Sequence, residues 1–212
     1  TRGLDMAGVS SLIINTTGSV VATGNGPTAG QEVRTTGSGK IVVKTSNTAS
    51  GSFMATNASH TVNISFQRSL DKTNSNSTTE WTLIGIPVAG ETLADLESEG
   101  KLATNGTKVG LGYFDNAAGQ WTTYTTGASV TLTQMKGYHV TPVNSGTSIT
   151  LEGTLLQDAW NTYSVNIESG SYGNWALVGN PFPSYLRMTD DATGGGTSND
   201  FLSDNIAGNV ID

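Results

Sequence analysis

Short apolar segments alternate with polar segments along almost the entire chain. β-Branched, aromatic and leucine residues gather in runs of three to six, and Gly, Asn, Ser and Asp separate one run from the next. Short runs that follow one another at roughly 8–12 residues are typical of a β-sandwich, a barrel or a solenoid. The predicted strands cover residues 12–14, 20–22, 41–43, 62–66, 81–86, 109–114, 121–124, 130–132, 138–140, 149–151, 163–167 and 175–178.

Residues 91–99 (ETLADLESE) are the one segment with a helical pattern. Leu93 and Leu96 are three positions apart, so they would share one face of a helix, and Gly100 is a suitable residue for its end. A single short helix among so many predicted strands indicates an all-β protein.

The first part of the chain contains a weak repeat of about 20 residues. Apolar residues recur in two series, which are Leu12, Val33 and Phe53, and Val20, Ile41 and Val62. The string TTGS also occurs at residues 16–19 and again at 35–38. Two strands in each period would suit a short β-solenoid, in which every coil stacks on the previous one. A series of ordinary hairpins would give nearly the same pattern, so both arrangements remain open.

A second repeat is stronger and connects two distant parts of the chain. Residues 81–87 (WTLIGIP) match residues 175–181 (WALVGNP) at the same spacing. Because side chains alternate along a strand, Trp81, Leu83 and Gly85 would share one face. We interpret Trp81 and Trp175 as core residues, and we expect the two strands to flank a set of hairpins and to close a sandwich.

Composition limits the classes of function. Only 13% of the residues are charged, against about 25% in typical soluble domains, and the net charge is -7. An acidic surface repels phosphate backbones, so nucleic acid is not an expected partner. No apolar run approaches the roughly 18 residues of a spanning helix, so membrane insertion is not expected either. The chain has 27 Gly and no Cys, which fits a bacterial exterior better than a disulfide-rich secreted domain.

Several strings resemble a module that recurs in secreted surface proteins of Bacteroidota. They are the two W-x-L-[IV]-G-x-P strings, YFDNAAGQW at 113–121, KGYHV at 136–140 and ITLEGTL at 149–155. The resemblance implies export by the type IX secretion route and residence on the cell surface or outside the cell. Such proteins usually end in a C-terminal sorting domain. We see none here, and the second module stops after its first strand, so we expect the chain to be a fragment of a longer protein.

Together these observations predict a jelly-roll-type β-sandwich preceded by a short β-solenoid-like or hairpin-rich segment. We expect residues 1–60 to form a β-rich stalk and residues 61–190 to form the sandwich module. Residues 191–212 would begin a further module or form a flexible tail.

No catalytic motif stands out. The chain lacks a G-x-S-x-G elbow, an H-E-x-x-H helix and a P-loop, and His60 and His139 lie in different strands. A glycosidase would need two carboxylates that face each other across a cleft, and nothing in the sequence pairs the available ones. These are Glu80, Asp115, Glu152 and Glu168. The sequence therefore favours a non-enzymatic protein.

Four carboxylates in a Gly-rich stretch form a candidate metal site. They are Asp190, Asp191, Asp200 and Asp204. Calcium takes six to eight oxygen ligands from such loops, so it is the cofactor that this stretch suggests. The EF-hand pattern is absent, and an ordinary polar loop is the alternative. Residues 115–119 (DNAAG) are better explained as a hairpin turn than as a cation site.

Aromatic residues form the candidate carbohydrate site. Trp121 and Tyr124 flank the DNAAG hairpin, and Trp160 lies in a predicted loop. Exposed flat rings could stack on sugars. The alternative is that Trp121 pairs across the hairpin with Tyr113.

The sequence therefore predicts an extracellular or cell-surface module for adhesion or scaffolding. Its expected partners are other modules, copies of itself joined through strand edges, and surface or glycan ligands. The alternative is a carbohydrate-binding module of a secreted polysaccharide-degrading enzyme. A hydrolase built on a β-sandwich is a third hypothesis, which would require two facing carboxylates in a groove.

Overall fold

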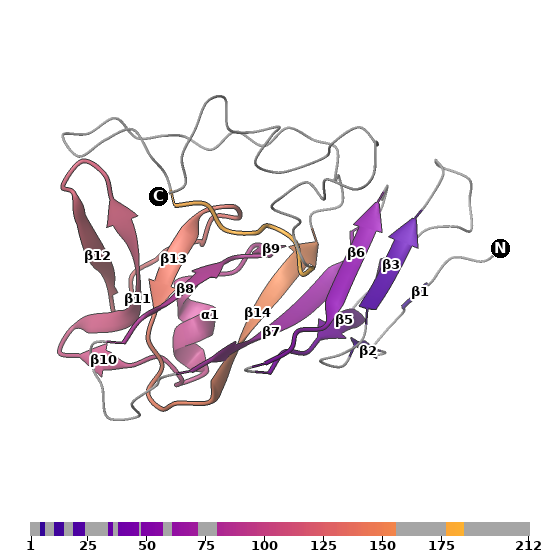
Figure 1. Cartoon of the computed structure of the whole chain (residues 1–212), viewed down its shortest axis with the longest axis horizontal. Coiled ribbons are helices and arrows are strands. Elements are labelled where there is room, and N and C mark those ends of the chain that lie inside the picture. The colour runs from indigo at the N-terminus through magenta and orange to yellow at the C-terminus, as the bar shows by residue number, and fades with distance from the viewer. Residues whose placement is uncertain are drawn as a thin grey trace, which may run out of the picture.

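The part of the chain that the structure describes is mostly β, with two five-stranded sheets and two two-stranded sheets (Figure 1). This architecture comes from a computed structural model, which describes residues 5–6, 11–14, 19–23, 34–35, 38–46, 48–56, 61–71, 80–155 and 177–184. The described residues contain one helix, of six residues. The prediction of a β protein is thus confirmed at the level of secondary structure.

The first five-stranded sheet, here called sheet 1, is antiparallel throughout. Its order is β10 (Thr104–Asn105), β11 (Lys108–Asp115), β13 (Gly137–Val140) and β8 (Thr82–Gly85), and β12 (Gln120–Thr125) also pairs with β11. The β11–β12 hairpin is closed by the predicted turn, in which Asp115 Oδ1 accepts hydrogen bonds from the backbone N–H groups of Ala117 and Ala118. Gly119 supplies the positive φ, 64°.

The second five-stranded sheet, sheet 2, combines parallel and antiparallel pairs. Its order is β2 (Ser11–Ile14), β5 (Lys40–Val43), β7 (Asn63–Leu70), β14 (Thr147–Leu155) and β9 (Val88–Ala89). The first three strands are parallel, and β14 runs antiparallel to β7 and β9. The two small sheets pair β1 (Asp5–Met6) with β4 (Arg34–Thr35) and β3 (Ser19–Thr23) with β6 (Ser52–Thr56), again in parallel.

The register of the N-terminal strands differs from the predicted repeat. Leu12 lies opposite Ile41, and Ile41 lies opposite Ile64, whereas Val20 lies opposite Phe53. The prediction of a constant period near 20 residues, with Val20 and Ile41 in equivalent positions, is therefore wrong. The segments between strands are unequal in length, and the register follows the match of apolar faces rather than a constant spacing.

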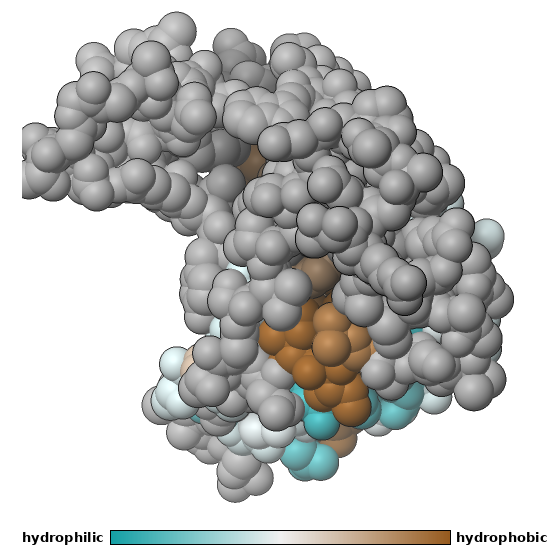
Figure 2. Space-filling view, turned by 90° about the vertical axis from the view of Figure 1, so that its right-hand side faces the viewer, coloured by the Kyte–Doolittle hydropathy of each residue, from teal (hydrophilic) through white to brown (hydrophobic). Residues whose placement is uncertain are grey.

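The outer strand of sheet 2 exposes an apolar residue. Ile13 of β2 is 52% exposed, while its neighbour Ile14 is buried. Figure 2 views the side of the molecule where the N-terminal strands lie and shows apolar side chains gathered in one patch.

The core lies on the inward faces of the two large sheets. From sheet 2 it takes Ile41, Val43, Ile64, Ile149 and Leu151, and from sheet 1 it takes Ile84, Val109, Leu111, Tyr138 and Val140. The hydroxyl group of Tyr138, whose ring is buried, accepts a hydrogen bond from the backbone N–H of Thr133, at 2.8 Å.

The helix α1 (Leu93–Ser98) lies between the two large sheets (Figure 1). Thr92 caps its N-terminus, and Thr92 and Asp95 form a capping box in which each side chain accepts a hydrogen bond from the other residue's backbone N–H. Leu93 and Leu96 are buried. The predicted helix at 91–99 is therefore confirmed, with the face that was expected to be apolar turned inward.

One predicted strand is not a regular strand, and another is described only in part. In the segment 130–132, Thr131 forms only an isolated bridge with Thr92. Only residues 177 and 178 of the predicted strand at 175–178 are described, and there Val178 forms an isolated bridge with Lys136. Trp175, which was expected in the core, lies outside the described residues. Residues 177–184, here called the strap, are an irregular segment that lies along sheet 1. The predicted strand at 163–167 lies outside the described residues.

Candidate functional site

Three aromatic rings from three strands or their ends form a stack on sheet 1. The imidazole of His139 lies between the indoles of Trp81 and Trp121. The ring centroids are 4.1 Å apart on the Trp81 side, with an interplanar angle of 17°, and 4.4 Å apart on the Trp121 side, with an angle of 22°. We call Trp81, His139 and Trp121 the aromatic platform.

A glycine makes this stack possible. His139 lies opposite Gly112 of β11, and Gly112 lies opposite Thr123 of β12. A Cβ atom on Gly112 would collide with Nε2 of His139 and with the carbonyl oxygen of Thr122. Because Gly112 has no side chain, Trp121 on β12 can extend across β11 and contact the imidazole.

The platform lies on the outward face of sheet 1. Trp81 is 38% exposed and Trp121 is 45% exposed, while His139 between them is buried. The prediction that Trp81 is a core residue is wrong. Residues 81–86 carry apolar groups on both faces, and the strand turns Ile84 and Ile86 inward, which places Trp81 and Leu83 outside.

Trp121 is further supported by its neighbour in the hairpin. It lies opposite Phe114, and the two rings meet edge to face with centroids 5.4 Å apart and an angle of 79°. The predicted cross-strand pair of Trp121 with Tyr113 is therefore wrong, because Tyr113 lies opposite Thr122 and packs against Tyr124.

His139 is a neutral group in this setting. Burial between the two indoles lowers its pKa below the ordinary value of 6.5, and the nearby carbonyl oxygen of Thr122 opposes the shift in part. The Nε2 atom of His139 has no hydrogen-bond partner within the described part of the chain. The imidazole therefore acts as a flat, uncharged spacer that orients the two indoles.

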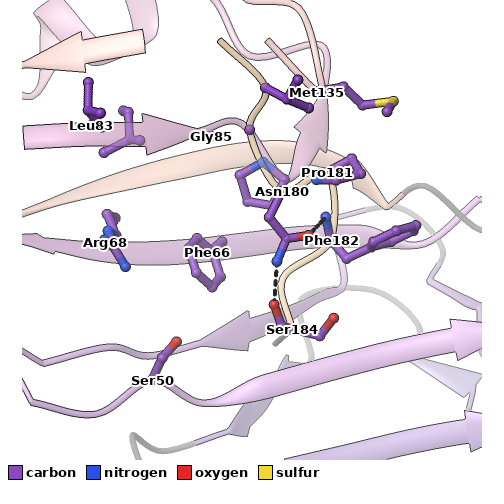
Figure 3. Close-up of a pocket in the computed structure, with 14 residues that line it drawn as sticks. Ser50, Phe66, Arg68, Leu83, Gly85, Met135, Asn180, Pro181, Phe182 and Ser184 are labelled. Atoms are coloured by element: carbon purple, nitrogen blue, oxygen red, sulfur yellow. Dashed lines mark hydrogen bonds between the residues drawn. The ribbon is translucent and has the colours of Figure 1, made fainter. Parts of the chain in front are cut away.

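A pocket of about 380 Å³ adjoins the platform (Figure 3). It lies between β8 of sheet 1, β7 of sheet 2 and the strap, and its lining residues are Ser50, Phe66, Arg68, Leu83, Ile84, Gly85, Pro87, Met135, Val178, Gly179, Asn180, Pro181, Phe182 and Ser184. Leu83, which is 54% exposed, is two residues from Trp81 on the same face of the strand. Leu83 also lies opposite His139, so this lining residue of the pocket is next to the platform.

Hydrogen bonds hold the strap over this pocket. The backbone N–H of Gly137 donates to the carbonyl oxygen of Leu177, and that of Gly179 donates to the carbonyl oxygen of Met135, both at 2.7 Å. Farther along, the N–H of Phe53 donates to the carbonyl oxygen of Pro183 at 2.8 Å.

Within the strap, Asn180 fixes the local bend. Its Nδ2 donates to the carbonyl oxygen of Ser184 at 2.6 Å, and its Oδ1 accepts from the N–H of Phe182 at 3.0 Å (Figure 3).

Trp121 and Tyr124, two of the three predicted carbohydrate-binding residues, do not share a face of the sheet. Trp121 is on the outward face of sheet 1, but Tyr124, three positions away, has the opposite orientation and packs against the core, where burial raises the pKa of its hydroxyl. Trp160 lies outside the described residues. Sequence reasoning missed Trp81 and His139, although the alternation of Trp81 and Leu83 with Ile84 and Ile86 contained the signal.

The predicted calcium ligands also lie outside the described residues. They are Asp190, Asp191, Asp200 and Asp204. Within the described ranges, no three His, Cys, Asp or Glu side chains gather as a metal site would require. His60 and Glu168, which were considered for catalysis, are likewise outside.

The described carboxylates occupy structural positions. Glu152 forms an exposed ion pair with Lys40 at 2.8 Å, and Asp115 closes the hairpin turn. Glu91 is only 1% exposed, and burial, aided by the carboxylates of Asp95, Glu99 and Glu152, raises its pKa to about 7. A substrate cannot reach a group so deeply buried, so we regard Glu91 as a structural residue rather than a general acid.

Comparisons with known proteins identify no relative of this chain. No protein-family model matches the sequence, and comparisons with curated proteins and with solved structures likewise find no match. In the described part of the chain, no helix has the length and apolar character that a membrane crossing requires.

Proposed function

We propose that this chain is a non-enzymatic extracellular module for adhesion or scaffolding, and that it binds a surface carbohydrate through the aromatic platform. The observation that carries the proposal is the exposure of two indoles, Trp81 and Trp121, which a buried imidazole holds in fixed and nearly parallel planes. Large exposed aromatic groups on a sheet face need a partner, because their burial would be strongly favourable.

A sugar ring suits this surface better than other ligands. The C–H groups on one face of a pyranose carry partial positive charge, and they complement the electron-rich face of an indole. The imidazole covers one face of each indole, so the exposed area of each lies elsewhere on the ring. Because stacking already fixes both indoles, little side-chain entropy would be lost on binding.

The setting of the module is proposed from the sequence motifs. Their resemblance to surface proteins of Bacteroidota supports a jelly-roll-type sandwich, export by the type IX route and a position on the cell surface. Parallel stacking of β2, β5 and β7 supports a solenoid-like arrangement for the N-terminal strands.

A scaffolding role through self-association is the second candidate. Strand β2 forms the outer edge of the described part of sheet 2 and exposes Ile13, which another strand could cover. Light scattering over a range of protein concentrations tests this role, and a monomer at every concentration would exclude it.

Binding to a glycan microarray and to insoluble polysaccharides tests the carbohydrate proposal. We expect Trp81→Ala and Trp121→Ala each to weaken binding at least about tenfold, because each removes a stacking surface. Ile13→Ala is the matched control, since Ile13 is also an exposed apolar residue but belongs to sheet 2. A protein that binds no glycan, or that binds equally well without both indoles, would refute the proposal.

A further inference from the structure

Arg68 has an unusual position for a charged residue. It lies on β7 directly opposite Ile149, and Phe66, two residues earlier, lies opposite Leu151. Ile149 and Leu151 are both fully buried, and side chains opposite each other in an antiparallel pair share a face. Arg68 is therefore on the core-facing side of sheet 2, where that side opens into the pocket (Figure 3).

The guanidinium of Arg68 has no ion pair with any residue that the structure describes. No carboxylate lines the pocket, whose walls near Arg68 are largely apolar and include Leu83, Met135 and Phe182. A guanidinium stays charged at any relevant pH, and a half-buried charge without a partner is unfavourable. An anionic ligand would supply the missing partner.

A second group in the pocket also lacks a partner. The Oγ atom of Ser184 is buried and makes no hydrogen bond within the described part of the chain, although Ser184 lines the pocket. A buried hydroxyl normally has a hydrogen-bond partner, so its absence marks this end of the pocket as incompletely satisfied. Arg68 on β7 and Ser184 on the strap thus both belong to the lining of the pocket, and Arg68 carries its charge.

We propose that this pocket binds the carboxylate of an acidic sugar, with Arg68 as the residue that pairs with it. The planar guanidinium can donate two parallel hydrogen bonds to a carboxylate. Leu83 joins the pocket to Trp81, so the neighbouring sugar ring of the same chain would stack on the platform. The ligand is then an oligosaccharide that contains hexuronic acid. This inference rests on the proposed function and specifies its ligand class.

The net charge of the whole protein affects how an anionic ligand would bind. The net charge of -7 repels anions at long range, so binding must come from the local contact with Arg68. Non-specific attraction of acidic polymers to the remaining surface is not expected.

Calorimetry with a tetramer of galacturonic acid and with the same tetramer after reduction of its carboxyl groups tests the inference. We expect wild-type protein to bind the acidic tetramer at least about tenfold more tightly than the reduced one. Arg68→Gln should remove this preference and leave affinity for the reduced tetramer unchanged. Arg68→Lys should retain part of this preference, because lysine keeps the positive charge but lacks the two parallel N–H donors of a guanidinium. Lys108→Gln is the control, since it removes an exposed cation far from the pocket lining.

The outcomes separate this inference from the proposed function. Equal affinity of wild-type protein for both tetramers would overturn the inference without any variant, so a folding defect in Arg68→Gln would not hide the answer. If Trp81→Ala then abolished binding of both tetramers, the proposal that the platform binds carbohydrate would be supported. Only the proposed preference for an acidic sugar would be refuted. Binding of the acidic tetramer that depends on Arg68 but not on Trp81 or Trp121 would instead refute the platform.

Discussion

Gly85 and Gly179 hold the same position in the two copies of the W-x-L-[IV]-G-x-P string, and in the folded chain they lie against each other. A Cβ atom placed on Gly85 would be 2.8 Å from Cα of Gly179 and 2.7 Å from the backbone nitrogen of Asn180. The first copy contains β8, and the described residues of the second copy, 177–181, belong to the strap, which contacts β8. The two copies of the string are therefore similar in sequence and also in contact in the folded chain.

Gly85→Ala tests this contact. The added methyl group would meet backbone atoms, which cannot move aside as a flexible side chain can, so we expect a loss of about 1–3 kcal/mol in the free energy of unfolding. Chemical denaturation measures the loss. The N–H of Gly137, which donates to Leu177 of the strap, should also exchange faster with solvent.

The double variant Gly85→Ala, Gly179→Ala distinguishes a shared contact from two separate ones. If either substitution displaces the strap, the second adds little, and the combined loss should be well below the sum of the single losses. Additive losses would show that the two glycines do not act through one interface.

Glu91 should make stability depend on pH. Its pKa is raised from 4.5 to about 7, so the folded state favours the protonated carboxyl. That contribution is present in full below pH 4.5 and is lost as the pH rises to about 7 and above, because the folded protein then carries a buried charge. We expect a loss on the order of 3 kcal/mol across this window.

Glu91→Gln serves as the comparison for this effect, since an amide keeps the shape and cannot ionise. Urea denaturation between pH 4.5 and 8 should show the variant gaining stability relative to wild type as the pH rises. Parallel curves for the two proteins would mean that Glu91 titrates normally.

Burial has the opposite effect on the pKa of His139, a base, which should titrate below pH 6.5. Burial disfavours its charged form, so the stability it contributes is present above 6.5 and is lost as the pH falls through its lowered folded pKa. Trp121→Ala would admit water to the imidazole and should raise this pKa toward 6.5. NMR titration of the imidazole C–H signals, assigned with His139→Gln, measures both values. A wild-type pKa at or above 6.5 would contradict the platform geometry.

Local sequence patterns were sufficient for most elements of the fold. The alternation in KVGLGYFD and QWTTYT, with Asp115 and Gly119 in the turn between them, specifies a hairpin whichever fold contains it. The helix α1 follows in the same way from Thr92, Asp95 and two buried leucines. The register of the parallel strands was not predictable, because it depends on how segments of unequal length pack.

The site was harder to predict for a related reason. In residues 81–86 both faces of the strand are apolar, so alternation separates the two faces without showing which is buried. The stack also depends on Gly112 opposite His139, which is a pairing between strands that are distant in the sequence. Arg68 gave no signal at all, because an arginine in a strand usually faces solvent.

The topology of sheet 2 also has a consequence for the timing of folding. Strand β7 takes β14 as its partner, and Lys40 pairs with Glu152, 112 residues further along. A ribosome synthesises about 5–20 residues each second, so β5 and β7 would wait several seconds for the strand that completes their sheet. Contacts of such long range also fold slowly once the chain is complete. The newly made polypeptide thus spends its first seconds without the completed sheet.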